Sequence, residues 1–195
     1  IGAPVDYFDA RTGTPTVDQM LAYWGVLTWV NYAYADKVAF GNNLADYVDG
    51  GGIVILGQWT LCTAGNCLGG RIMTDPGYNP AAGSSYGGSQ YAGDGARCVH
   101  EGVVSYEASS YRDNISVVPG ATSDGHWLHG IPAVAYWPSG PTKVWYSPGH
   151  TGGAYSTGDW ALLTANIMLC VCCGPENDCN GNLIPDDCDI LYCDG

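Results

Sequence analysis

Short apolar runs alternate with segments of helical periodicity over the first 57 residues. Continuous apolar stretches stand at 4–8, 25–30 and 53–57, and their length and composition are typical of buried strands. Between the first two, Thr16 is followed three residues later by Gln19, which is the spacing of a capping box. The pattern therefore predicts a helix that begins after Thr16 and lies between two strands.

A second helix is predicted to begin after Asp36, because the apolar residues that follow recur at helical spacing. These residues are Phe40, Leu44, Tyr47 and Val48. Three glycines stop the pattern, and Gly50 stands where a left-handed C-terminal cap is expected. Strands and helices that alternate in this order predict an α/β fold with a parallel sheet and right-handed crossovers.

Residues 58–114 differ in composition and are predicted to form a long loop or insertion. They are rich in Gly, Ser, Tyr and Asn, and their periodicity is weak. Beyond them, β-like runs stand at 115–118, 131–137 and 142–147. The apolar spacing of 157–169 then predicts a closing helix.

Composition and charge narrow the class of partner. Hydrophobic residues make up 46% of the chain, which is enough for a core, whereas charged residues make up only 13%. The formal charge is −13, with six Lys and Arg, so nucleic acids and anionic membranes are poor partners and cations are favoured ones. The sequence has no run of 18 apolar residues, so no membrane span is predicted. The start at Ile1, without a methionine, is interpreted as a processed or trimmed end.

Nine cysteines in a chain of this length predict disulfides and a secreted or cell-surface location. Cys62 and Cys67 flank a four-residue loop and are close enough to pair. Other cysteines crowd the end of the chain: Cys170, Cys172, Cys173, Cys179, Cys188 and Cys193. Their connectivity stays open, and the odd total leaves one thiol free or paired outside the chain. Because the composition becomes acidic beyond Gly174, the chain is divided into an α/β domain over 1–173 and an acidic, Cys-rich tail over 174–195.

Four stretches resemble a known family. The run NYAYADKVAFGNNLADYVDGGGIVILG with the following LGGR, and the later WLHGIPAVAYW and GDWALLTANIML, resemble the flavodoxin-like domain of the trehalose-utilisation (ThuA-like) and class I glutamine-amidotransferase-like group. The resemblance implies a mostly parallel sheet flanked by helices over about residues 4–170. It also implies an origin in large bacterial surface proteins.

The tail motif DCNGNLIPDDCDI resembles one cysteine-bearing calcium-binding repeat of the thrombospondin type 3 kind. Its oxygen-bearing groups follow the spacing of a calcium loop, since calcium takes six to eight hard oxygen ligands. The predicted ligands are Asp178, Asn180, Asn182, the Ile184 carbonyl, Asp186 and Asp189. Cys179 and Cys188 are predicted to be disulfide cysteines, and Leu183 departs from the Gly that such loops usually carry. The alternative is a solvated acidic tail that binds no metal.

No catalytic motif of the resembling family follows a predicted strand. The nearest candidate, Cys98 with His100 in GARCVHEG, lacks a preceding apolar strand, so a disulfide at Cys98 is the preferred interpretation. Three histidines suggest a zinc trio only weakly and are interpreted as surface or core residues: His126, His129 and His150. Carboxylates in or near the loop give a similarly weak suggestion of glycoside hydrolysis: Asp75, Asp94, Glu101 and Glu107. The chain is therefore predicted not to be an enzyme.

Aromatic residues are frequent in the Gly/Ser-rich region: Trp59, Tyr78, Tyr86, Tyr91, Tyr106 and Tyr111. If exposed, they stack on sugars or pack against a protein partner; if buried, they cover their own sheet. Asn114 opens an N-glycosylation sequon, Asn-Ile-Ser, and is a candidate glycan site.

A missing strand gives the family resemblance a structural consequence. Members usually begin with a strand that lies inside the sheet, before the segment that matches 4–8. Its absence leaves unpaired backbone groups, which a strand from a neighbouring copy could satisfy by β-augmentation. Head-to-tail contacts of this kind make filaments when they do not close. The leading hypothesis is therefore a non-enzymatic extracellular structural subunit with a calcium-braced tail, and the alternative is a carbohydrate-binding or carbohydrate-processing module.

The calcium hypothesis predicts a calcium-dependent assembly. Sedimentation velocity in millimolar calcium should give large, uniform species that fall apart in excess chelator, because the clustered carboxylates repel one another without the metal. A monodisperse monomer under both conditions would contradict the structural hypothesis.

Overall fold

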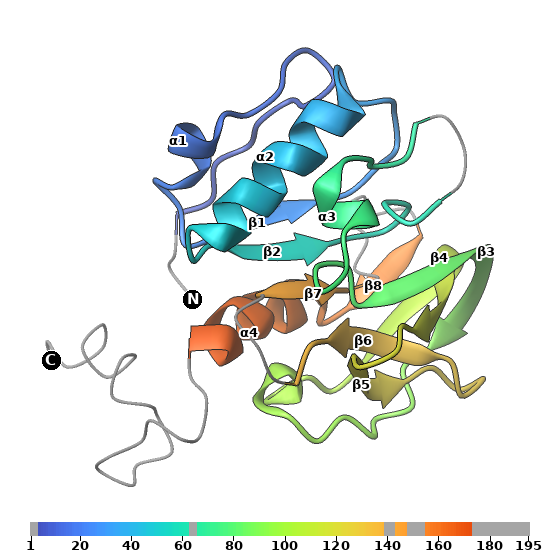
Figure 1. The fold of residues 1–195 in the computed structure, drawn as a ribbon. Helices are drawn as coiled ribbons and strands as arrows, with labels where there is room; N and C mark the ends of the chain where they lie inside the picture. Colours follow the sequence, from blue (N-terminus) through green and yellow to red (C-terminus); the bar gives the residue numbers. More distant parts are fainter. Residues whose placement is uncertain (1–3, 63–65, 139–142, 148–154, 173–195) are drawn as a thin grey trace, which may run out of the picture.

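The computed structural model describes residues 4–62, 66–138, 143–147 and 155–172 (Figure 1). Its helices are α1 (Val17–Met20), α2 (Lys37–Asp49), α3 (Arg71–Thr74), the short 3₁₀ helix η1 (Cys98–His100) and α4 (Trp160–Cys172). Its strands are β1 (Gly25–Thr28), β2 (Ile53–Leu56), β3 (Ala81–Gln90), β4 (Tyr106–Val117), β5 (Thr122–His126), β6 (Pro132–Tyr136), β7 (Val144–Tyr146) and β8 (Ser156–Gly158). The calcium ligand set Asp178 to Asp189, with Cys179 and Cys188, lies outside the described residues, as does His150.

The central sheet has five strands in the order β1-β2-β7-β6-β5. β1 and β2 pair in parallel, and so do β2 and β7, whereas β6 runs antiparallel to both of its neighbours. The predicted α/β class is confirmed, with its parallel part made of the apolar runs that the sequence pattern assigned to buried strands. The sheet as a whole is mixed, because a hairpin of β5 and β6 extends it on the β7 side.

The two predicted N-terminal helices are confirmed. Thr16 and Gln19 form the reciprocal capping box at the start of α1, and the Asp36 side chain accepts hydrogen bonds from the N–H groups of Val38 and Ala39 at the start of α2. The predicted left-handed cap at Gly50 is wrong by one residue. Gly50, the C-cap residue, has φ −78° and ψ 2°, and the positive φ falls on the next residue, Gly51, at +97°.

The core consists of two clusters on opposite faces of the central sheet. Val54 and Leu56 pack on one face against α2, while the intervening Ile55 packs on the other face against α4. Figure 1 shows α1, α2 and α3 on one side of β1 and β2 and α4 on the other. The alternation of adjacent strand residues between two apolar layers explains why β2 is apolar throughout.

The prediction of a long loop over 58–114 is wrong for much of its length. This segment contains α3, β3 and most of β4, and β3, β4 and β8 form a second, antiparallel sheet. The β3–β4 register shifts twice, and a Cβ at Gly83 or Gly88 would overlap the backbone of β4. Glycine here allows two irregular strands to approach closely, so a composition typical of loops forms a sheet.

The prediction of a strand at 4–8 is also wrong. These residues have no strand pairing, and Val5 and Tyr7 are exposed. Among the strands that the structure describes, β1 therefore ends the sheet on this side. No helix of the described residues is long and apolar enough to cross a membrane.

Candidate functional site

The aromatic residues of the Gly/Ser-rich region divide into two groups. Tyr78 and Tyr106 are buried in the core, and Tyr91 packs against it. Trp59, Tyr86 and Tyr111 instead gather near the molecular surface, together with Tyr155, which the sequence analysis did not single out. We call these four residues the Trp59 cluster.

The rings of the Trp59 cluster contact one another edge to face. Trp59 lies 5.6 Å from Tyr111 and 6.4 Å from Tyr86 between ring centroids, and Tyr111 lies 4.9 Å from Tyr155. The three tyrosines are each between 42% and 44% exposed. The cluster therefore keeps part of every tyrosine ring in contact with solvent.

Two members of the cluster have strained backbone. Among the described residues, Trp59 (φ +64°) and Tyr111 (φ +65°) are the non-glycine residues with positive φ. A bulky side chain in this left-handed region costs on the order of 1–3 kcal/mol and persists only where surrounding contacts enforce it. Trp59 also stands three residues beyond the end of β2, at the carboxyl edge of the parallel strands, where α/β sheets commonly bind ligands.

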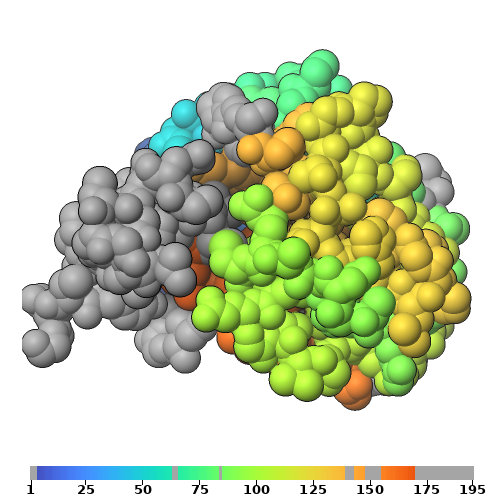
Figure 2. Space-filling model, turned by 90° about the horizontal axis from the view of Figure 1, so that it is seen from below, coloured from blue at the N-terminus to red at the C-terminus, as the bar shows by residue number. Residues whose placement is uncertain are grey.

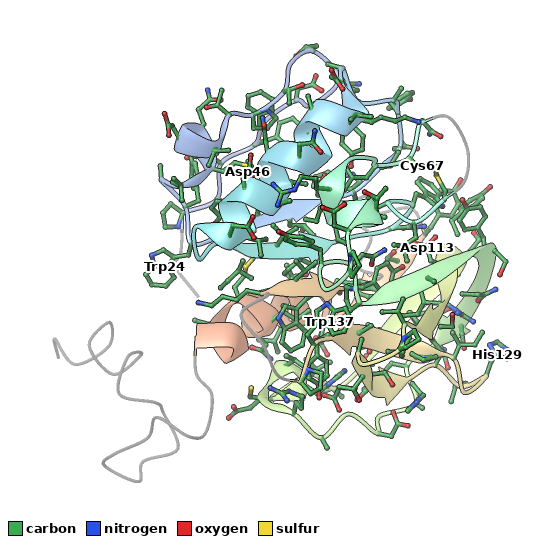
Figure 3. All side chains as sticks on the ribbon, in the orientation of Figure 1. Trp24, Asp46, Cys67, Asp113, His129 and Trp137 are labelled. Carbon is green, nitrogen blue, oxygen red and sulfur yellow. A yellow bond between two sulfur atoms is a disulfide. The ribbon has the colours of Figure 1, made fainter. Side chains whose placement is uncertain are left out.

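Asp113 enforces the Trp59 conformation. Its fully buried carboxylate oxygen Oδ2 accepts the backbone N–H of Trp59 at 2.9 Å and the hydroxyl of Tyr146 at 2.6 Å. It thereby joins the turn after β2 to β4 and to β7, and Figure 3 places it between the helical layer and the β3–β4 sheet. Burial raises the pKa of Asp113 to about 6, against the two hydrogen bonds, which lower it.

The side chains around Asp113 are polar, but the neighbouring Arg112 does not pair with its carboxylate. Arg112 directs its guanidinium to the Asn114 side chain and over the Trp127 ring, 5.0 Å from the centroid. The Gln58 amide donates to the Tyr111 carbonyl, which fixes the second strained residue. Within the described part of the chain, Gln58 Oε1 and Asp113 Oδ1 have no hydrogen-bond partner. The buried side chains of Asp113 and Gln58 thus hold the strained backbone of Trp59 and Tyr111 through hydrogen bonds.

An open groove of about 410 Å³ lies on the β3–β4 sheet. Its lining includes Ser89, Gln90, Glu107, Ser109, Leu128 and His129. The Gln90 amide donates to Glu107 at 3.1 Å, and the Ser109 N–H donates to the Tyr155 carbonyl at 2.8 Å. The second bond connects the wall of the groove to the Trp59 cluster, so the two features adjoin along β4.

The histidines and carboxylates considered for chemistry are dispersed. His126 pairs with Asp94 at 3.0 Å, His129 lies 3.5 Å from an Arg112 nitrogen, and Asp75 pairs with Arg71. The described residues contain no group of three or more His, Cys, Asp or Glu side chains that could hold a metal ion.

From below (Figure 2), the segment that joins β3 to β4, in green to yellow-green, and strands β5 and β6, in yellow, form much of the visible face.

The predicted disulfide between Cys62 and Cys67 is confirmed, and Cys98 is also disulfide-bonded. The latter excludes Cys98 as a free nucleophile in this state. His100 is buried and lies 2.9 Å from Asp124 through Nδ1. Asp124 also accepts the N–H groups of Ala96 and Arg97, so this pair ties the 91–105 segment to β5.

Asn114, the candidate glycan site, lies within β4 rather than before a strand. Its side-chain amide donates to the Ser85 hydroxyl at 3.2 Å and its oxygen accepts from Arg112. Glycan attachment at this nitrogen stays a prediction.

Comparisons with known proteins identify no family for this chain. No protein-family model matches it, and no curated protein matches it. Among solved structures, it is similar to the β-galactosidase from Rahnella sp. R3, with a TM-score of 0.47 and 16% sequence identity. The match covers 76% of this chain and 21% of that chain, so this chain spans about a fifth of that protein's length. A similarity this low supports no argument about function.

The raised pKa of Asp113 predicts a pH-dependent stability. In the folded state the Asp113 carboxyl keeps its proton up to about pH 6. In the unfolded chain its pKa is about 4, so it loses the proton at a lower pH. The resulting stability is complete below about pH 4 and is lost as the pH rises through about 6, by at most about 3 kcal/mol. In Asp113→Asn, whose amide oxygen can accept from both the Trp59 N–H and the Tyr146 hydroxyl, this loss should be absent in urea unfolding measured across that range.

The matched control is Asp18→Asn, at an exposed position of α1. It should follow the pH dependence of the unchanged protein. An identical pH dependence in Asp113→Asn would show that this carboxyl does not titrate as its burial requires.

Proposed function

We propose that this chain is a non-catalytic extracellular module that binds carbohydrate through the Trp59 cluster and the adjoining groove. The observation that carries the proposal is the strained backbone of Trp59 and Tyr111 beneath half-exposed rings. Strain of this kind concentrates at functional sites, since stability alone would favour glycine or asparagine at such positions.

The chemistry of the surface supports a neutral, hydroxyl-rich ligand. Aromatic rings offer apolar faces to the C–H faces of sugars, and tyrosine adds a hydroxyl for hydrogen bonds. The chain carries a formal charge of −13 with six Lys and Arg, which disfavours phosphate-bearing ligands. A saccharide needs neither a positive site nor a large apolar cavity.

The groove supplies polar groups suited to sugar hydroxyls. Gln90 and Glu107 hold each other in place through one hydrogen bond, and Ser89 and Ser109 add small hydroxyl groups on the same surface. Its volume of about 410 Å³ falls within the usual range of ligand sites, about 300–1,000 Å³. An open shape suits an extended chain of sugar units that crosses β4 between the groove and the cluster.

The proposal is binding rather than hydrolysis. Glycoside hydrolysis uses two carboxyl groups that face each other across the scissile bond. Glu107 is hydrogen-bonded to Gln90, and Asp94 is paired with His126. These partners suit positioning of polar groups better than transfer of a proton between paired acids.

The extracellular location and the assembly role are part of this proposal. The Cys62–Cys67 disulfide favours an oxidising compartment. A structural subunit braced by calcium at Asp178 to Asp189 is the second candidate function, and the outer edge of β1, which pairs with no other described strand, favours it. Binding of sugar and assembly into a surface layer are compatible roles for one extracellular protein.

Sugar binding is predicted to depend on the exposed tyrosines. On a glycan array the native protein should retain at least one class of neutral oligosaccharide, and titration calorimetry should then give its affinity. Tyr86→Ala and Tyr155→Ala should each weaken binding at least about tenfold, which corresponds to about 1.4 kcal/mol. Tyr32→Ala removes an exposed aromatic ring outside the cluster and should leave the affinity unchanged.

Two results would reject the carbohydrate proposal. One is the absence of any retained glycan in the native, disulfide-bonded protein. The other is an affinity that Tyr32→Ala lowers as much as the cluster variants do.

A further inference from the structure

Two buried oxygen atoms beneath the Trp59 cluster lack a hydrogen-bond donor. They are Oε1 of Gln58, a residue that is 1% exposed, and Oδ1 of Asp113, which is 0% exposed. Neither atom has a hydrogen-bond partner among the residues that the structure describes. A buried acceptor without a donor loses its hydration without compensation, so such atoms are few in folded proteins. A donor is therefore missing from this layer.

Gln58 and Asp113 connect the same two stretches of chain. The Gln58 amide donates to the carbonyl of Tyr111, and Asp113 Oδ2 accepts the N–H of Trp59 at 2.9 Å. Gln58 and Trp59 are consecutive in the turn after β2, while Tyr111 and Asp113 stand two residues apart in β4. The two bonds thus cross one layer side by side, and this layer also contains the two oxygens without a donor.

Among the described residues of the surrounding elements, no cation compensates the Asp113 carboxylate. Arg112 is the preceding residue of β4, but its guanidinium lies over Trp127 in the opposite core cluster, 5.0 Å from the ring centroid. Tyr146 on β7 already donates to Oδ2, and Tyr86 stands opposite Asp113 in the β3–β4 register. Burial raises the pKa of both phenols, so they are uncharged at neutral pH. The turn after β2, residues 57–60, contains no charged residue.

Protonation of Asp113 supplies the missing donor. A protonated carboxyl group donates a hydrogen bond through one oxygen and still accepts through the other. With the proton on Oδ1, Asp113 can donate to Gln58 Oε1, while Oδ2 keeps the Trp59 N–H and the Tyr146 hydroxyl. One proton then satisfies both oxygens. Burial, which raises the pKa of Asp113 to about 6, favours this protonated state.

We propose that a hydrogen bond from protonated Asp113 to Gln58 holds the Trp59 cluster in its binding conformation and makes sugar affinity depend on pH. The inference rests on the proposed function, because it concerns the regulation of the same site. Loss of the proton leaves two acceptors in one buried layer, which loosens Gln58 and the strained Tyr111 backbone that it holds. Tyr111 contacts the Trp59 ring, so the cluster loosens with it. Sugar affinity is then highest below about pH 6 and falls as the pH rises through this value.

Fluorine NMR of the whole protein, labelled with 5-fluorotryptophan, follows the Trp59 ring without any sugar. The chain has seven tryptophans, and the Trp59 resonance is assigned by its absence in Trp59→Phe. We expect this resonance to titrate with a midpoint of about pH 6. In Asp113→Asn it should not titrate, because the amide can donate to Gln58 Oε1 at every pH. The exposed control Asp18→Asn should titrate as the unchanged protein does.

Gln58→Met tests the second partner of the proposed bond. Methionine has a similar size but carries no acceptor oxygen, so the protonated state of Asp113 loses its partner. The midpoint of the Trp59 titration should therefore move down toward that of an ordinary aspartate, about 4. An unchanged midpoint would overturn the proposal. If this variant does not fold, Asp113→Asn decides the question, since a Trp59 resonance that still titrates in that variant also overturns it.

Sugar binding is measured separately, by calorimetry with an oligosaccharide that the native protein retains on a glycan array. The affinity should fall at least threefold as the pH rises through about 6, and it should stay constant in Asp113→Asn. A pH-independent affinity in the native protein would overturn the regulation. If no glycan is retained, the carbohydrate proposal fails, and the regulation of sugar binding fails with it. The fluorine titration then still shows whether the Asp113 proton controls the cluster, so the two failures are distinguishable.

Discussion

The buried carboxylate of Asp113 joins three parts of the molecule that are far apart in sequence. It accepts the N–H of Trp59 beyond β2 and the hydroxyl of Tyr146 on β7, while it belongs to β4 of the second sheet. An ionised carboxyl in this position loses its hydration, and burial raises its pKa to about 6. The arrangement costs stability in exchange for a fixed relation between the two sheets.

That relation determines what the surface above it presents. With the backbone of Trp59 and Tyr111 held in the left-handed region, four aromatic rings meet at the carboxyl edge of β2 and beside the groove on β4. Without the Asp113 and Gln58 contacts, both backbones would relax to commoner conformations. The carbohydrate proposal therefore depends on buried polar groups as much as on the exposed rings.

Sequence patterns over a few neighbouring residues correctly predicted those features of the fold that depend only on neighbouring residues. The capping pattern at Asp36, the fully apolar β2 and the short Cys62–Cys67 loop each carry their cause in a few neighbouring residues. β3 and β4 could not be predicted in this way, since glycines serve there to bring two backbones together, a need set by the partner strand. Likewise, strand alternation puts Tyr106 and Tyr111 on opposite faces of β4, but only the packing of Trp160 in α4 against Tyr106 determines which of the two is buried.

Backbone strain at Trp59 is the central claim, and the difference in stability between Trp59→Ala and Trp59→Gly tests it most directly. Both variants lose the indole ring, but only glycine adopts a φ of +64° without steric cost. Trp59→Gly should have the higher free energy of unfolding, by about 1 kcal/mol, whereas the same pair at Trp24, outside the left-handed region, should show the opposite order. A Trp59→Gly variant less stable than Trp59→Ala would contradict the account.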